Sequence, residues 1–157
     1  MHCACTRIDA NAAGSAATSG FRECRELNAL RRVTAAEFSS GADVADAIAL
    51  AAHPMDRHLA GSSGQNLTFL ERPGVIPLSS LVSAKCPNLL AAGGLVAAEP
   101  AAFASMRVQA QCMAMGQAAG TAAAFMRGED VRSLDFAAVR RICEKQGAIT
   151  KWDNGDS

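Results

Sequence analysis

The sequence predicts an α/β fold, and most of that prediction rests on residues 88–125. Residues 88–92 (NLLAA) form a run that is apolar after its first residue, which is typical of a strand buried inside a parallel sheet. Gly93 and Gly94 then end the strand, and a helix built largely from small residues follows, extending to about Met126. Because this order places a helix N-terminus beside the end of a strand, it indicates a binding site for an anionic cofactor.

The composition limits the classes of function. The 157 residues suit one domain, and because they carry no net charge and show no basic stripe, we expect no nucleic-acid partner. Aromatic residues make up only 4% of the chain, so the core must be built mainly from Ala, Val, Leu and Met. The most apolar window, residues 108–126, still contains three glutamines and a threonine. We therefore expect a buried helix there and no membrane span.

The six cysteines are scattered through the chain, and no signal peptide precedes them. This pattern favours buried, reduced thiols in a cytoplasmic protein. His2, Cys3 and Cys5 lie close together, but a metal site needs further ligands from a second cluster, which the sequence does not offer. The sequence therefore predicts no metal site.

The first part of the chain predicts a flexible lead-in, a strand and a short helix. Residues 1–20 mix Ala, Ser, Thr and Gly without hydrophobic period, so we expect no fixed structure there. Residues 21–28 alternate in character, as a strand would. Thr34, with Glu37 three residues later, forms a capping box for a short helix that Gly41 ends.

The middle of the chain predicts a helix followed by two extended segments. Residues 43–52 are expected to form an amphipathic helix that closes before Pro54. Its apolar face would consist of Val44, Ala47, Ile48 and Ala51. Residues 66–70 and 75–82 are rich in strand-forming residues and are expected to be extended.

Residues 53–58 (HPMDRH) concentrate polar chemistry in a short segment. One interpretation places Asp56 and His58 at a substrate or proton-transfer site as catalytic residues. The alternative is a loop whose polar groups satisfy neighbouring backbone amides. The sequence leaves both open.

The long helix, expected from about Ser105, has small residues on two adjacent stripes. Gly116 and Gly120 each cost about 1 kcal/mol relative to alanine inside a helix. We therefore expect close packing around these glycines and around Ala118 and Ala119 to offset that cost. A final helix is expected from Ser133 or Asp135 to Gly147.

Together these motifs resemble the carboxy-terminal signature of a family of FAD-dependent oxidoreductases with a glutathione-reductase-like FAD fold. The resemblance spans about residues 21–149. Its strongest segments are residues 88–93 (NLLAAG), 105–108 (SMRV) and 112–122 (CMAMGQAAGTAA). Weaker ones are residues 22–25 (RECR), 46–48 (DAI), 54–58 (PMDRH), 75–77 (VIP) and 80–81 (SL).

The resemblance implies the carboxy-terminal part of a two-domain, Rossmann-like FAD-binding oxidoreductase, with an incomplete sheet. Residues 21–85 would belong to the substrate domain and residues 86–128 to the FAD-binding domain. Residues 129–157 would form the terminal helix and tail. The helix starting near Arg107 would point its N-terminus at the flavin ring. The residues expected to bind FAD are Gly93, Ser105, Met106, Arg107, Val108 and Gln109.

The chain also departs from the family pattern. Gly94 stands where many relatives have Arg, and Pro100 stands where they have His. Relatives commonly read Tyr-Arg where this chain has Leu78 and Ser79. Above all, no GxGxxG turn follows a strand, because Gly14 and Gly20 have the wrong spacing and no strand before them.

Two functions therefore stand as hypotheses. The first is an FAD-dependent oxidoreductase that acts on an unknown small molecule. This chain would be a fragment or subunit that supplies the flavin-ring side of the FAD site, and another chain would supply the GxGxxG half. The second is a non-catalytic remnant or interaction module that keeps pieces of the fold without binding FAD.

Overall fold

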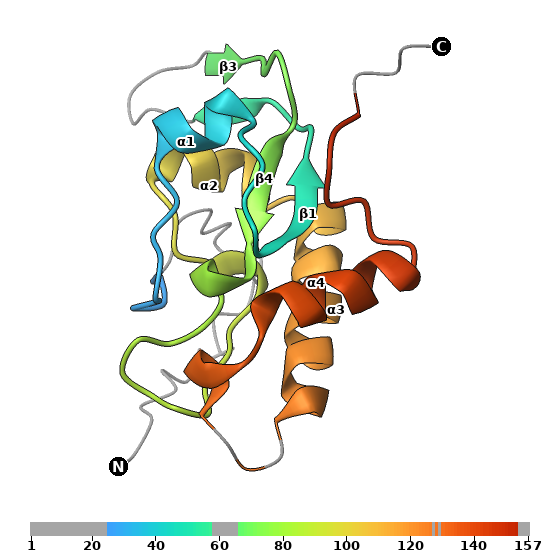
Figure 1. Ribbon diagram of the computed structural model, residues 1–157. Helices are drawn as coiled ribbons and strands as arrows, with labels where there is room; N and C mark the ends of the chain where they lie inside the picture. The colour runs from blue at the N-terminus through green and yellow to red at the C-terminus, as the bar shows by residue number, and fades with distance from the viewer. Residues whose placement is uncertain (1–24, 58–65, 127, 129, 154–157) are drawn as a thin grey trace, which may run out of the picture.

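The computed structural model describes residues 25–57, 66–126, 128 and 130–153. Helices and short strands are mixed along the chain, as an α/β protein requires (Figure 1). The α-helices are α1 (Ala35–Ser40), α2 (Pro100–Met106), α3 (Gln109–Phe125) and α4 (Phe136–Lys145). The strands are β1 (Ala47–Ala51), β2 (Met55–Arg57), β3 (Asn66–Thr68) and β4 (Gly74–Pro77). Three 3₁₀ turns are η1 (Leu78–Ser80), η2 (Gly93–Leu95) and η3 (Val131–Ser133).

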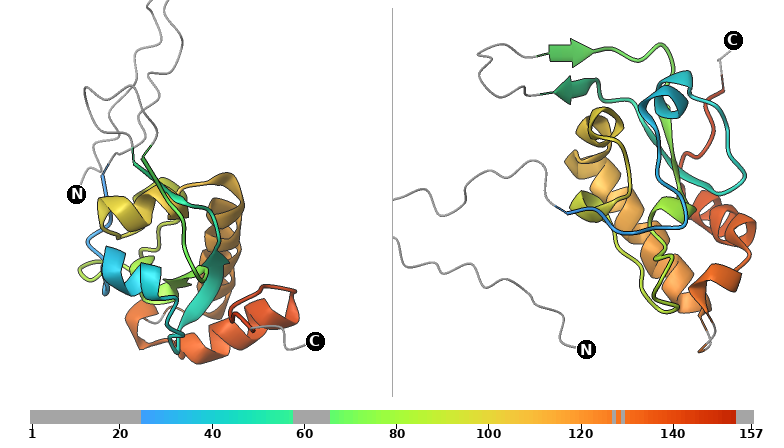
Figure 2. Two further views of the ribbon diagram at one scale, coloured as in Figure 1. Left: turned by 90° about the horizontal axis from the view of Figure 1, so that it is seen from above. Right: turned by 90° about the vertical axis from the view of Figure 1, so that its left-hand side faces the viewer.

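The strands form two small antiparallel sheets. β1 pairs with β4, placing Leu50 opposite Val75, and β2 pairs with β3, placing Asp56 opposite Leu67. α3 and α4 pack on one side of β1, and α2 packs against β2 (Figure 2). The described residues contain no parallel sheet, so the prediction of a buried strand in a parallel sheet is wrong.

Residues 88–92 do not form the expected strand. Leu90 makes one isolated antiparallel bridge to Val82, and the Ala91 amide donates to the Leu81 carbonyl at 2.9 Å. Within the described part of the chain, this run therefore pairs only with the segment that precedes it across the Pro87 turn. Leu89 is 42% exposed, because no further strand covers it in the described part of the chain.

Residues 43–52 also differ from the sequence prediction, since β1 replaces the expected amphipathic helix. Five of these ten residues are alanine, which suits either face of either element, so the helical spacing carried little information. Pairing with β4 buries Ala47, Ile48 and Ala49 together. Here tertiary contacts override the local pattern.

The first described residues form an irregular segment. Residues 25–28 form no strand, and residues 21–24 of the expected strand lie outside the described residues. The Leu27 amide donates to the Leu95 carbonyl at 2.8 Å, and Ala29 bridges to Ser83. These contacts hold the segment against the η2 turn.

The capping signals at α1 and α4 are confirmed. The Thr34 hydroxyl accepts a hydrogen bond of 3.2 Å from the Glu37 amide, and Gly41 ends α1 in the left-handed region at φ 61°. The Asp135 carboxylate accepts from the Ala138 amide at 3.1 Å. Gly147, with φ 94°, follows α4.

The expected single helix is in fact two helices. Pro100 occupies the first turn of α2, where its fixed φ favours helix initiation. The chain breaks at Arg107 and Val108, and α3 begins at Gln109. Ser105 and Met106 therefore end the first helix instead of starting the long one.

The core lies between α3, α2 and the β1–β4 sheet. Its largest fully buried side chains are Phe38, Ile48, Ile76, Leu78, Leu81, Met106 and Met115. α3 contributes Gln111, Met115, Ala118 and Ala122 to the buried interior. The expected close packing holds for Ala118, but a Cβ added at Gly116 or Gly120 would meet nothing within 4 Å.

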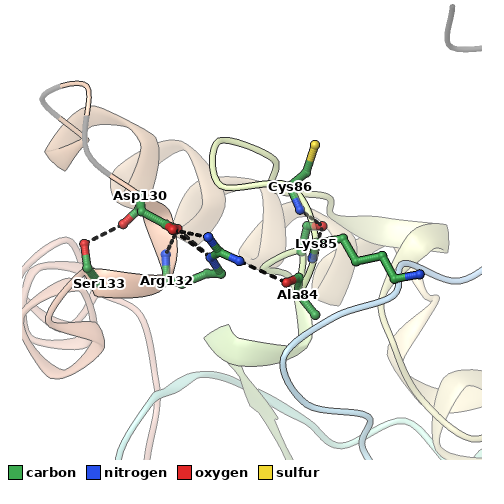
Figure 3. A network of polar contacts seen from close by, with 7 residues as sticks. Ala84, Lys85, Cys86, Asp130, Arg132 and Ser133 are labelled. Carbon is green, nitrogen blue, oxygen red and sulfur yellow. Dashed lines mark hydrogen bonds and ion pairs between the residues drawn. The ribbon is translucent and has the colours of Figure 1, made fainter. Parts of the chain in front are cut away.

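A polar network fixes the loop that leads to the η2 turn (Figure 3). Arg132 donates to the Ala84 carbonyl at 3.1 Å and forms an ion pair with Asp130. The hydrogen bonds that the side chain and the amide of Arg132 donate to Asp130 hold the pKa of that carboxyl below its usual value. The Val131 amide adds a 2.8 Å hydrogen bond to the Pro87 carbonyl. The turn before α4 thus anchors residues 84–87.

The described residues offer no membrane span and no metal site. No helix there is both long and apolar enough to cross a lipid bilayer. No group of three or more His, Cys, Asp or Glu residues is placed to hold a metal ion, again within the described ranges.

Candidate functional site

The η2 turn requires glycine at its first position. Gly93 has φ 67°, a left-handed conformation that side chains disfavour. A Cβ at this position would lie 3.6 Å from the Cys112 sulfur, so the turn sits directly against the first part of α3. A Cβ added at Gly94 would meet no atom within 4 Å. Gly94 is exposed and Gly93 is half-buried, so the turn presents backbone beside a helix start.

The start of α3 has no side-chain cap. Val108 occupies the N-cap position, and its side chain cannot accept a hydrogen bond. The first amides of a helix have no acceptor within the helix, and they carry the positive end of its dipole. Gln109 is exposed at this end, whereas Val108 is half-buried. These amides can bind an anionic group.

Arg107 adds a positive charge at the junction of α2 and α3. One terminal nitrogen of its guanidinium (Nη2) donates to the Asp56 carbonyl at 3.3 Å. Its Nε is buried and has no hydrogen-bond partner among the residues that the structure describes. A second such buried atom is Oε1 of Gln111, in the first turn of α3. A donor and an acceptor are thus both unused near this helix start.

Ser105 and Met106 lie inside the protein, both with no exposed surface. The Ser105 hydroxyl donates a hydrogen bond of 2.5 Å to the His53 carbonyl. Since Arg107 binds the Asp56 carbonyl in the same way, the end of α2 holds the segment before and within β2 at two points. The exposed His53 ring also contacts the Pro54 carbonyl, 2.7 Å from Nδ1.

Cys112 is a site residue to which the sequence assigned no role. Its thiol donates to the Arg107 carbonyl at 3.3 Å, and its sulfur faces Gly93. Burial raises the pKa of this thiol, which keeps it protonated at neutral pH. Cys112 therefore joins the turn to the junction. In the sequence, the position of Cys112 about one turn after the start of α3 could have indicated that it lies near the site.

The structure brings several expected site residues together. Gly93 meets α3 through Cys112, and Arg107 lies against the Asp56 backbone. His58 lies outside the described residues, so the expected pairing of Asp56 with His58 stays a prediction. So does contact between FAD and Gly93, Ser105, Met106, Arg107, Val108 and Gln109.

Comparison with known proteins assigns the chain to a family. Neither the curated proteins nor the solved structures gave a match. A family model described as FAD dependent oxidoreductase matches residues 4–142, which is most of the chain. The chain therefore belongs to the family of FAD-dependent oxidoreductases, for which FAD is the cofactor.

Proposed function

We propose that this chain supplies the flavin-ring side of the FAD site of an oxidoreductase. The observation that carries the proposal is Arg107, a guanidinium with an unused buried Nε, placed at the uncapped N-terminus of α3. The buried Oε1 of Gln111, in the first turn of α3, is an acceptor without a hydrogen-bond partner among the described residues. A ring whose edge carries acceptors, as the flavin pyrimidine does, fits the half-buried guanidinium of Arg107 and the uncapped first amides of α3.

The charges at this junction favour a reduced flavin. FAD supplies hydride transfer when it is bound, and the reduced ring carries negative charge. Arg107 and the first amides of α3 offer positive charge, which stabilises the reduced form more than the oxidised form. Gly93 allows close approach of the backbone to the ring.

The expected site residues would divide between contact and support. Gly93, Arg107, Val108 and Gln109 lie at the turn and at the helix junction, so we assign them to contact with the ring. Ser105 and Met106 have no exposed surface, and they would hold the junction in position from within. Asp56 and His58 remain our candidates for proton transfer to or from a small-molecule substrate.

A complete FAD site would need a second component. In the described residues both sheets are two-stranded and antiparallel, and neither offers a strand–GxGxxG–helix unit for the pyrophosphate. The outer face of α3 is open at Gly116 and Gly120, and Met113 and Phe125 on this helix are 70% and 46% exposed. We propose that a GxGxxG-bearing part packs there and completes a glutathione-reductase-like, Rossmann-type domain. Cys86, Cys112 and Cys143, the cysteines among the described residues, form no disulfide, which favours a cytoplasmic setting.

The visible absorbance of bound flavin tests this proposal. The chain is purified alone and after co-expression with a complementary GxGxxG half, and the bound flavin is quantified in each. We expect yellow protein from the co-expression, with reduced occupancy in the variant Arg107→Met. The matched control is Arg141→Met, because Arg141 is an exposed arginine on α4 paired only with Asp135 among the described residues. Colourless protein in both preparations would refute the proposal.

A second candidate function is an interaction module without a redox role. The observation in its favour is an apolar groove of about 750 Å³ between β1, α3 and residues 147–152. No charged residue lines this groove, and its rim includes Leu50, Met113, Ile149 and Trp152. A protein that is colourless in both preparations, yet folded, would favour this second function.

A further inference from the structure

A small cavity lies beside the glycine turn, and it is separate from the proposed flavin contacts. Its volume is about 130 Å³, and Gly94 lines it directly. Because a water molecule occupies roughly 30 Å³ of liquid, the cavity has room for about four waters. A ligand of this size has only a few heavy atoms.

One wall of the cavity is apolar. It is formed by Val96 and Ala98, which follow the glycine turn, and by Pro100 and Phe103 of α2. Val96, Ala98 and Phe103 are buried, whereas Pro100 is exposed at the mouth. A short hydrocarbon group placed against this wall would be removed from water.

Charged residues also line the cavity, at its rim in our reading, and one positive charge among them is uncompensated. Arg32 donates to both oxygens of Glu26, at 2.9 and 3.1 Å. Arg25 also lines the cavity and makes no hydrogen bond or ion pair within the described part of the chain. Glu99 lies 4.0 Å from Arg32, but it does not line the cavity, and its other oxygen accepts from the Ala35 amide.

The ion pair at the rim can exchange partners. The side chains of Arg32 and Glu26 are 49% and 46% exposed, and exposed ion pairs contribute little free energy. An incoming carboxylate can therefore bind Arg25 and share Arg32, since guanidinium groups match carboxylates in charge and geometry. A cation would gain no free acceptor beyond Glu26.

We propose that this cavity binds a short-chain monocarboxylate. The carboxylate would bind Arg25 at the rim, and the hydrocarbon part would lie on the wall formed by Val96, Ala98 and Phe103. The net charge of the rim selects one negative charge, and the volume limits the acid to a few carbons.

The position of the cavity links it to the flavin side. Gly94 lines the cavity, while its neighbour Gly93 faces Cys112 of α3, so one short turn separates the two regions. As the substrate pocket of the oxidoreductase, the cavity would define the substrate class as small carboxylic acids. That assignment of the ligand as substrate rests on the proposed function, whereas binding itself does not.

A titration of the isotope-labelled chain, followed by nuclear magnetic resonance, tests the proposal without FAD. Butyrate is the probe, and butanamide is its neutral counterpart of the same shape. We expect butyrate to shift the Gly94 amide and the Val96 and Ala98 methyl signals, and butanamide to bind at least about tenfold more weakly. Inorganic phosphate, an anion without an apolar part, should also bind more weakly than butyrate.

Two variants locate the binding charge. Arg25→Gln should weaken butyrate binding by about tenfold or more. Arg25→Lys should keep most of the affinity, and Arg141→Gln on α4 should leave it unchanged. The spectrum of each variant also reports whether it is folded.

Several outcomes would overturn the proposal. These are equal binding of butyrate and butanamide, tighter binding of phosphate than of butyrate, or an unchanged affinity in folded Arg25→Gln. The result also separates the two proposals. A chain that binds butyrate but never binds FAD would keep the cavity and lose the oxidoreductase function. A chain that binds FAD but not butyrate would keep the oxidoreductase function and lose the proposed carboxylate site.

Discussion

The hydroxyl of Ser105 donates a 2.5 Å hydrogen bond to the backbone carbonyl of His53, and Ser105 has no exposed surface. This bond joins the last turn of α2 to the loop before β2. Arg107, two residues later, binds the Asp56 carbonyl at 3.3 Å. The side chains of Ser105 and Arg107 therefore hold the polar segment around Asp56 beside the start of α3, through the backbone carbonyls of that segment.

Replacing this hydroxyl should destabilise the protein. Ser105→Ala leaves the His53 carbonyl without its donor, which should lower the free energy of unfolding by about 1–3 kcal/mol. Urea denaturation measures the loss. Ser39→Ala is the matched control, because the Ser39 hydroxyl is exposed and donates to the nearby Ala36 carbonyl. Equal stability of the two variants would contradict a structural role for Ser105.

The β4 strand should not tolerate a side chain at Gly74. A Cβ there would lie 2.4 Å from two ring atoms of Phe38, which is only 1% exposed and cannot move aside freely. Gly74→Ala should therefore cost about 1–3 kcal/mol through overpacking. Gly94→Ala, at a position with nothing within 4 Å, should change stability far less. Thermal denaturation compares the two, and a reversed order would refute the packing described for Phe38.

The open face of α3 makes the opposite prediction at Gly120. A Cβ there would meet nothing within 4 Å, so Gly120→Ala should stabilise the isolated chain by about 1 kcal/mol through helix propensity. Chemical denaturation measures this gain. In the co-expressed complex the same variant should lower FAD occupancy, because the added methyl would obstruct the proposed second part. If Gly120→Ala stabilises the isolated chain and also leaves FAD occupancy of the complex unchanged or higher, the second part does not pack on this face.

Arg107 should affect the flavin more than it affects the fold. Arg107→Met removes a positive charge beside the uncapped start of α3, which should lower the two-electron reduction potential of bound FAD. A shift of about 30 mV corresponds to a tenfold change in the equilibrium. Reduction of the co-expressed complex against a reference dye measures it. Arg141→Met is the control, and an equal potential in both variants would remove Arg107 from the flavin environment.

Local signals in the sequence predicted the elements that local interactions control. Thr34 and Gly41 bound α1, and Asp135 and Gly147 bound α4, because caps and left-handed glycines act within one turn of the chain. The β1 strand could not be predicted in this way. Its identity depends on pairing with β4, some 25 residues further along, and its alanines fit a helix equally well.

The candidate site was predictable only in part, for the same reason. The η2 glycines and Arg107 lie within one motif, so the sequence placed them together. The break between α2 and α3 was missed, although Pro100 signals an earlier helix start. The cavity joins Arg25 and Arg32 to Phe103, which are far apart in the sequence, and no local spacing reveals such a contact.

The carboxylate of Glu144 on α4 makes the stability of the protein depend on pH. A hydrogen bond from Thr150, and then one from Arg140, hold the pKa of Glu144 below its usual value of 4.5. The folded state thus favours the charged carboxylate, so this stabilisation is present above about pH 4.5 and is lost as the pH falls through the lowered pKa. Glu144→Gln should be less stable than the natural chain at neutral pH, and this difference in stability should shrink as the pH falls below about 4.5. Melting temperatures measured from neutral to acidic pH show this, with Asp153→Asn as an exposed control. A difference that stays constant across the range would contradict the role of Glu144.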